Sequence, residues 1–255
     1  MKMYRVLLFL PSFLYATKLS TVAYDELTKT NIDIIVEEHG AFAVTGLPQE
    51  YTEAVQTLQA LAPDCLQDLP TFTLQDGSKR STFARENGQE YLDCLETESR
   101  VINKYFTNVD NIVSSLIVDM IGSEAGWVDP EGDLTTAEYK EHLHVYTHQH
   151  SDHEELSVPY HTDNGLMLML THFQQHPLII RTKTGDTLET DILGDDSIII
   201  ILGSALPDWL LRHSPLSSRF QAAAHAVPSL SSNIDSRTVL ARMKVTQERR
   251  RFFTL

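Results

Sequence analysis

The residues of this sequence with the clearest chemical potential are His161, Asp163 and His225. His161 and Asp163 are two positions apart, and on a strand such residues point to the same side, so that an imidazole and a carboxylate converge. His225 follows 62 residues after Asp163. Two imidazoles and a carboxylate can hold one face of a metal ion and leave the other face open. These ligands favour a ferrous ion over metals that prefer soft ligands, although zinc or manganese could occupy them too.

An arginine follows this set at a short distance. Arg237 comes twelve residues after His225 and opens the strand-like run 237–241. A guanidinium on a buried strand needs an anion, and a carboxylate is its natural bidentate partner. Arg242 is a weaker alternative for the same role. The sequence therefore predicts a metal ion beside an arginine that binds a carboxylate.

A second histidine-rich string competes for the metal. Residues 147–153 read THQHSDH, which resembles the HxHxDH string that gathers zinc ligands for hydrolysis in the metallo-β-lactamase fold. In that fold glycines usually trail the string and a late histidine supplies a further ligand. Here Glu154 and Glu155 follow, and His225 is the last histidine of the chain. A zinc hydrolase that uses His148 to His153 stays open as an alternative.

The elements that must position these residues change in character near residue 130. Before it, apolar residues at helical spacing predict helices over 24–38, 51–61 and 95–121, with a strand at 41–45 and a polar hairpin or loop over 70–92. After it, short β-rich runs alternate with turns. They cover residues 143–146, 166–170, 178–182, 187–191, 197–202 and 238–245. We expect an α+β protein, with a helical region at 17–129 and a double-stranded β-helix (jelly-roll) core at 130–255.

The chain resembles the iron- and 2-oxoglutarate-dependent dioxygenases of the isopenicillin N synthase-like group. The resemblance lies in the order and spacing of residues 161–163, His225 and Arg237. Residues 39–44, HGAFAV, resemble the step from helix to strand in the N-terminal region of that group. Tyr146 lies 15 residues before His161, where the family often has a tyrosine that touches the co-substrate. The resemblance covers most of the chain.

The resemblance implies a role for each of these residues. His161, Asp163 and His225 would bind Fe(II), and Arg237 would hold the distal carboxylate of 2-oxoglutarate with help from Tyr146. Asn164 is a candidate contact for the substrate or a metal-bound water, and a turn role is the alternative. The implied reaction uses O₂ to oxidise an unactivated C–H bond.

Two departures from the family pattern affect these expectations. The family motif is Arg-x-Ser, and Val239 stands at the third position, so that one hydroxyl contact is missing. The co-substrate is therefore 2-oxoglutarate or a different acid. Only 18 residues follow Arg237, too few for the long C-terminal helix of the family. We expect a more open mouth, which would accept a larger substrate such as a peptide.

Composition narrows the class of partner. The 255 residues include 35 acidic and 20 basic side chains, a formal net charge of −15, and 42% are hydrophobic. The hydrophobic content argues against disorder. The negative charge argues against nonspecific nucleic-acid binding and against adhesion to anionic membranes. We expect a small-molecule substrate, no nucleic acid and no membrane span in the mature chain.

The first 16 residues have the layout of a secretory signal peptide. Lys2 and Arg5 precede a short apolar run that is too short to span a bilayer comfortably. A secreted or secretory-route protein is therefore predicted, and a cytoplasmic one if residues 1–16 are a buried strand. Cys65 and Cys94 would form a disulfide in an oxidising compartment or remain two buried thiols.

Three functional classes follow from the sequence. The favoured one is an oxygenase that acts on a small metabolite. An oxygenase of the same chemistry that acts on a peptide or protein in the secretory route is the second, and a non-catalytic barrel is the third. The zinc hydrolase stands beside them as an outsider.

Overall fold

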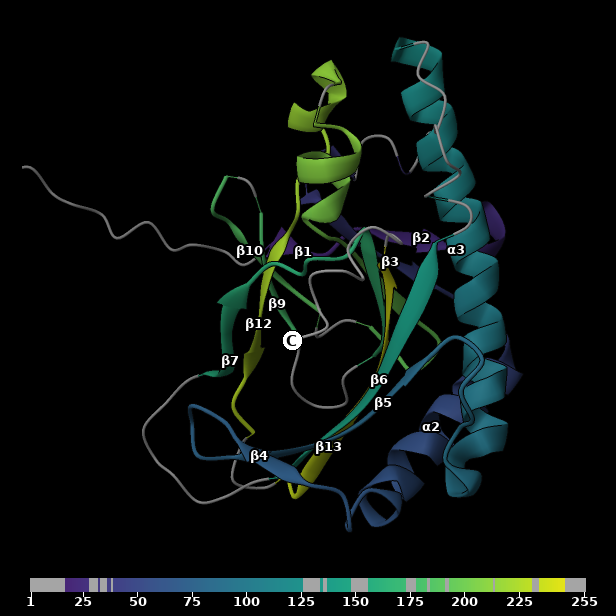
Figure 1. The fold of residues 1–255 in the computed structure, drawn as a ribbon, viewed down its shortest axis with the longest axis vertical. Coiled ribbons are helices and arrows are strands. Elements are labelled where there is room, and N and C mark those ends of the chain that lie inside the picture. Colours follow the sequence, from purple (N-terminus) through teal and green to yellow (C-terminus); the bar gives the residue numbers. More distant parts are fainter. Residues whose placement is uncertain are drawn as a thin grey trace, which may run out of the picture.

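A computed structural model gives the fold of the chain (Figure 1). It describes residues 17–27, 32, 36–37, 39–125, 134, 137–147, 156–172, 178–182, 184–190, 193–212, 214–230 and 234–245. The strands of these residues form two sheets that face each other. The smaller sheet has the order β1 (Thr17–Lys18), β10 (Thr187–Glu189), β9 (Ile179–Arg181), β12 (Ala224–Pro228), β7 (Leu156–His161). The larger sheet has the order β2 (Thr21–Ala23), β3 (Ala41–Thr45), β11 (Ile198–Leu202), β8 (Met167–Thr171), β13 (Ser236–Val245), β6 (Glu138–Thr147), β5 (Lys79–Glu86), β4 (Thr71–Thr73).

Two long helices cover the outer side of the larger sheet (Figure 1). They are α2 (Gln49–Cys65) and α3 (Glu96–Ala125), where the sequence predicts helices over 51–61 and 95–121. Helix α2 runs through Pro63 to Cys65 and so ends four residues after the predicted end at residue 61. The end of α2 is tied to η2 (Asp93–Leu95) by the Cys65–Cys94 disulfide. The described residues also form the short helical turns η1 (Tyr24–Glu26), η3 (Leu206–Leu210) and η4 (Pro215–Ser218).

The first half of the chain supplies strands as well as helices. Strand β3 is buried and pairs with β11, and the polar stretch 70–92 contains the β4–β5 hairpin, whose second strand pairs with β6. The N-terminal part is thus built into both sheets rather than set apart as a helical region, because its apolar strand completes the jelly roll. Most of the helix predicted over 24–38 lies outside the described residues, and so do residues 1–16.

The alternation of side chains along the larger sheet separates two cores. Ile198 and Ile200 of β11 pack toward the helices, whereas Ile199 and Ile201 pack between the two sheets. This strand is buried on both faces, as its continuous apolar run predicts. The alternation also decides where polar side chains go, because neighbouring positions on a strand face either the helices or the space between the sheets. None of the described helices is both long and apolar enough to cross a membrane.

Candidate metal centre

Strands β7 and β12 bring His161 and His225 side by side. The two residues are direct partners in the antiparallel ladder, and their ring centroids are 4.4 Å apart. Nδ1 of His161 lies 2.9 Å from the carbonyl oxygen of Pro159, and Nδ1 of His225 lies 3.3 Å from that of Ala223. A carbonyl oxygen only accepts, so each Nδ1 donates its hydrogen. The Nε2 atoms of both rings are therefore left with the lone pair that a metal ion needs.

Asp163 joins the two histidines from a bend rather than from a strand. Strand β7 ends at His161, and the backbone N–H of Ser204 donates to the carbonyl oxygen of Asp163 at 2.8 Å. This bend packs so closely on the segment after β11 that a Cβ on Gly203 would lie 2.1 Å from the carbonyl oxygen of Gly165. The predicted convergence of the two side chains is found, but a backbone contact from a distant segment positions the carboxylate.

The three side chains form a group that fits a divalent metal ion. Their ligand atoms all lie within 4.8 Å of one another. Asp163 Oδ2 lies 3.5 Å from His225 Nε2, and Oδ1 lies 4.0 Å from His161 Nε2. Asp163 Oδ2 is buried and accepts no hydrogen bond from any described residue, which a bound cation would explain.

The surroundings keep this group ready to bind a cation. His225 is 4% exposed, and burial lowers the pKa of its imidazole, with the charge of Asp163 opposing and that of His161 adding to the effect. A lowered pKa favours the neutral ring, which is the form that binds metal. The side chain of His161 is 42% exposed. The group is thus buried on the His225 side and open on the His161 side.

A cavity of about 110 Å³ lies between the sheets and includes the three residues of the group. Its walls are mostly apolar, with a row of polar side chains from β6. The residues that line it are Arg80, His142, His144, Tyr146, Val158, His161, Asp163, Leu168, Leu170, Leu178, His225, Val227, Val239, Ala241 and Met243. Apolar walls with few polar groups are typical of small-molecule sites.

Tyr146 and Arg237 are neighbours at the edge of this cavity. They are direct partners between β6 and β13, and the guanidinium carbon lies 4.7 Å from the ring centroid. Arg237 is 2% exposed, and its Nη1 donates to the carbonyl oxygen of Pro228 at 3.1 Å. Burial lowers the pKa of Arg237 to about 10, against the opposing charges of Tyr146 and Asp76. Tyr146 lines the cavity, whereas Arg237 is not among the described residues that line it.

Two further candidates from the sequence lie elsewhere. Arg242 is not an alternative carboxylate clamp, because it is five positions after Arg237, faces the helices and is ion-paired with Glu141. Asn164 accepts a hydrogen bond from the Ser204 hydroxyl at 3.3 Å and is not among the described residues that line the cavity. Val239 does line the cavity, at the position where the family has a serine.

Three residues of the cavity wall were not among the site residues predicted from the sequence. His142 and His144 lie within β6, and His144 Nδ1 is 2.9 Å from the Thr82 hydroxyl. Arg80 was not singled out, because only the pairing of β5 with β6 shows which face it takes. His148, His150 and His153 lie outside the described residues.

Comparison with known proteins shows the fold. No protein-family model matches the chain, and no curated protein matches its sequence. Among solved structures, a protein from Shewanella oneidensis assigned as an oxygenase has a TM-score of 0.65 at 17% identity, covering 94% of this chain and 100% of that one. AtDAO1, the dioxygenase for auxin oxidation 1 from Arabidopsis thaliana, was solved with 2-oxoglutarate and has a TM-score of 0.64 at 13% identity, covering 89% and 92%. A full-length Neurospora crassa protein, solved with alpha-KG and thymine, has a TM-score of 0.61 at 11% identity, covering 91% and 87%.

Proposed function

We propose that this chain, whose fold is that of solved 2-oxoglutarate- and Fe(II)-dependent oxygenases, is itself such an enzyme and oxidises an unactivated C–H bond of a small molecule with O₂. The observation that carries the proposal is the group of His161, Asp163 and His225, whose ligand atoms lie within 4.8 Å at a cavity of this fold. Two imidazoles and one carboxylate with an open side are the ligand set of non-haem Fe(II) oxygenases.

The side chains divide the work of binding and orientation. His161, Asp163 and His225 would hold Fe(II), which together with 2-oxoglutarate supplies the oxidising chemistry when bound. The Arg237 guanidinium and the Tyr146 hydroxyl, adjacent on β13 and β6, would hold the distal carboxylate of 2-oxoglutarate. The apolar walls exclude water from the reacting centre.

A small-molecule substrate is supported by two observations. The cavity measures about 110 Å³, which suits a compact ligand better than an extended chain. Two of the similar structures also point to small molecules: the Neurospora crassa protein was solved with thymine, and AtDAO1 is a dioxygenase for auxin oxidation. Binding of metal and co-substrate can be tested by calorimetry with Mn(II), which replaces Fe(II) without reacting with O₂.

We expect one Mn(II) per chain, and 2-oxoglutarate binding only after Mn(II) is present. His225→Ala should lose both binding events. His172→Ala is the matched control, because His172 is 9% exposed and lies beside Asp195, outside the cavity wall. With Fe(II) and O₂, the loaded protein should convert 2-oxoglutarate to succinate in the presence of its substrate. Binding of 2-oxoglutarate without metal, or no binding to the metal-loaded protein, would contradict the proposal.

We also propose that the chain is exported and loses residues 1–16. The disulfide between Cys65 and Cys94 supports this, because disulfides persist mainly in oxidising compartments. N-terminal sequencing of the mature protein is the test, and a retained Met1 would contradict the proposal.

A further inference from the structure

Arg80 lies in the wall of the cavity, in line with Tyr146 and Arg237 across three neighbouring strands. It pairs with Tyr146 between β5 and β6, and Tyr146 pairs in turn with Arg237 of β13. Residues directly opposite one another on paired strands point to the same side. Arg237, Tyr146 and Arg80 therefore form one row across three strands, on the face toward the smaller sheet. With strands about 4.8 Å apart, the backbones of the two arginines are separated by roughly 10 Å.

The charge of Arg80 has no counterpart among the described residues. Its Nε is buried and donates no hydrogen bond, and its guanidinium takes part in no ion pair within the described part of the chain. Buried donors without an acceptor are rare in folded proteins and unfavourable. Arg85, five positions along the same strand and on the opposite face, instead donates to Glu141, Tyr91 and the carbonyl oxygen of Gln89.

The other polar groups of the cavity wall do not neutralise Arg80. Asp163 is the sole carboxylate among the described lining residues, and it belongs to the metal group. His142 and His144 lie near enough that the charge of Arg80 adds to burial in lowering the pKa of both rings. With neutral imidazoles and no counter-charge for Arg80 among the residues that the structure describes, this part of the wall is positive.

We propose that Arg80 binds a carboxylate of the substrate, so that the substrates are small organic acids. The inference rests on the proposed function and names the substrate class of the same site. A guanidinium binds a carboxylate through two parallel hydrogen bonds, which would satisfy the buried Nε and orient the acid. Arg237 and Arg80 lie on opposite sides of Tyr146, and they would serve the co-substrate and the substrate respectively.

The test uses matched acids and amides on the loaded full chain. Protein with Fe(II) and 2-oxoglutarate is titrated anaerobically, by calorimetry, with phenylacetate against phenylacetamide and with hexanoate against hexanamide. Each pair has nearly the same shape and differs in charge. The variants are Arg80→Gln, Arg80→Lys and, as the control, Lys79→Gln, which removes the same charge from the opposite face of β5.

We expect at least one acid to bind about tenfold or more tightly than its amide, as a charge-assisted hydrogen bond allows. Arg80→Gln should abolish this preference without changing the affinity for 2-oxoglutarate, Arg80→Lys should restore part of it, and Lys79→Gln should keep it. The proposal is overturned if no acid is preferred over its amide by the wild type, or if Arg80→Gln keeps the preference. It is also overturned if Arg80→Gln instead lowers the affinity for 2-oxoglutarate, because Arg80 would then hold the co-substrate. Failure of the proposed function would show earlier, as absence of metal-dependent 2-oxoglutarate binding in the wild type.

Discussion

The two faces of the larger sheet carry the same pattern of arginines with opposite outcomes. On each face, a central residue of β6 lies between an arginine of β13 and an arginine of β5. The row toward the helices is Arg242, Glu141 and Arg85, and the row toward the cavity is Arg237, Tyr146 and Arg80. The difference is the central side chain, a carboxylate in one row and a phenol in the other. In the helix-side row the carboxylate of Glu141 is ion-paired with both arginines, whereas the phenol of Tyr146 in the cavity-side row offers no such counter-charge.

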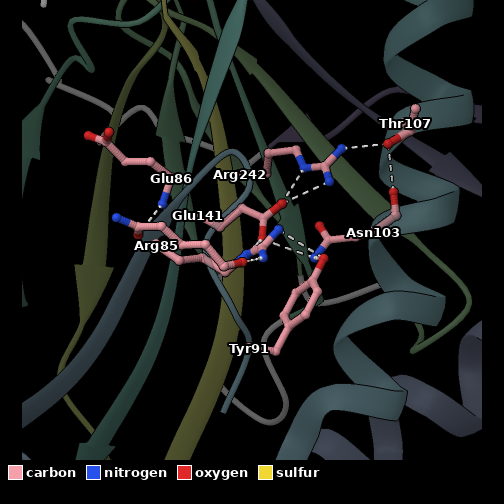
Figure 2. Close-up of polar contacts among 8 residues, drawn as sticks. Arg85, Glu86, Tyr91, Asn103, Thr107, Glu141 and Arg242 are labelled. Carbon is pink, nitrogen blue, oxygen red and sulfur yellow. Dashed lines mark hydrogen bonds and ion pairs between the residues drawn. The ribbon is translucent and has the colours of Figure 1, made fainter. Parts of the chain in front are cut away.

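The helix-side row is a closed network (Figure 2). Glu141 Oε1 accepts from Nε and Nη2 of Arg242 at 3.0 and 2.8 Å, and Oε2 accepts from Arg85 and from Asn103 of α3. Arg242 also donates to the Thr107 hydroxyl at 2.7 Å. All three charges lie between the sheet and α3, so this row joins the helix to the sheet.

The largest effect should come from removing a metal ligand on the cavity side. His225→Ala is expected to lower metal affinity by more than about 100-fold, since even partners of metal ligands contribute 10- to 100-fold. The fold should persist, because the change leaves the helix-side network intact. Metal content after dialysis, together with circular dichroism, measures both. Full metal occupancy in this variant would move the metal site elsewhere, for example to the string at His148 to His153.

Glu141→Gln should produce the converse result. It leaves Arg242 and Arg85 buried without a counter-charge, and breaking a buried ion pair costs about 3–5 kcal/mol of unfolding free energy. Metal affinity of the folded protein should not change. Denaturant unfolding and metal titration test the two parts, with Tyr146→Phe as the comparison for the cavity row. Equal stability losses in both variants would show that the two rows do not differ as described.

Arg237→Gln should lower the affinity for 2-oxoglutarate by about 10- to 100-fold, which corresponds to the loss of a hydrogen bond to a charged group. Metal affinity should stay at the wild-type level, and Arg237→Lys should recover part of the loss. Calorimetric titration of the metal-loaded variants with 2-oxoglutarate gives the numbers. Unchanged affinity in Arg237→Gln would assign Arg237 a structural role.

The pH dependence of the stability of the metal-free protein should depend on His144. Burial, with the charges of Arg80 and His142, lowers the pKa of His144 to about 3 in the folded state. Below pH of about 6.5 the unfolded chain takes up a proton that the folded chain excludes. The free energy of unfolding is therefore highest above that pH. It decreases as the pH falls, by up to about 1.4 kcal/mol per pH unit. His144→Gln should flatten unfolding free energy between pH of about 6 and about 5, and an unchanged slope would mean that His144 protonates in place.

The smallest effect is expected at Val239. Val239→Ser restores the hydroxyl of the family motif on the cavity wall, and one hydrogen bond is worth about 0.5–1.5 kcal/mol. Affinity for 2-oxoglutarate should rise several-fold, with Val239→Ala as the control for side-chain size. Weaker binding in the serine variant alone would indicate that the native co-substrate is a different acid.

Local patterns were sufficient for much of this fold. The periodicity of hydrophobic residues predicted α2, α3 and β11. Residue type and spacing singled out His161, Asp163 and His225, which the structure brings together. Parity along β13 could also have excluded Arg242, which is an odd number of positions from Arg237. Register between distant strands could not be read from one sequence, so the place of Arg80 opposite Tyr146 remained hidden. The contact between Ser204 and Asp163 was hidden for the same reason.

The most direct test is an anaerobic titration of the Fe(II)-loaded protein with 2-oxoglutarate, followed by visible absorption. A keto acid that binds Fe(II) produces a weak band in this region. We expect the band in the wild type, its loss in His161→Ala and its weakening in Arg237→Ala at the same 2-oxoglutarate concentration. If iron binds but no band appears, the co-substrate is an acid other than 2-oxoglutarate. If no iron binds, the proposed oxygenase function is contradicted.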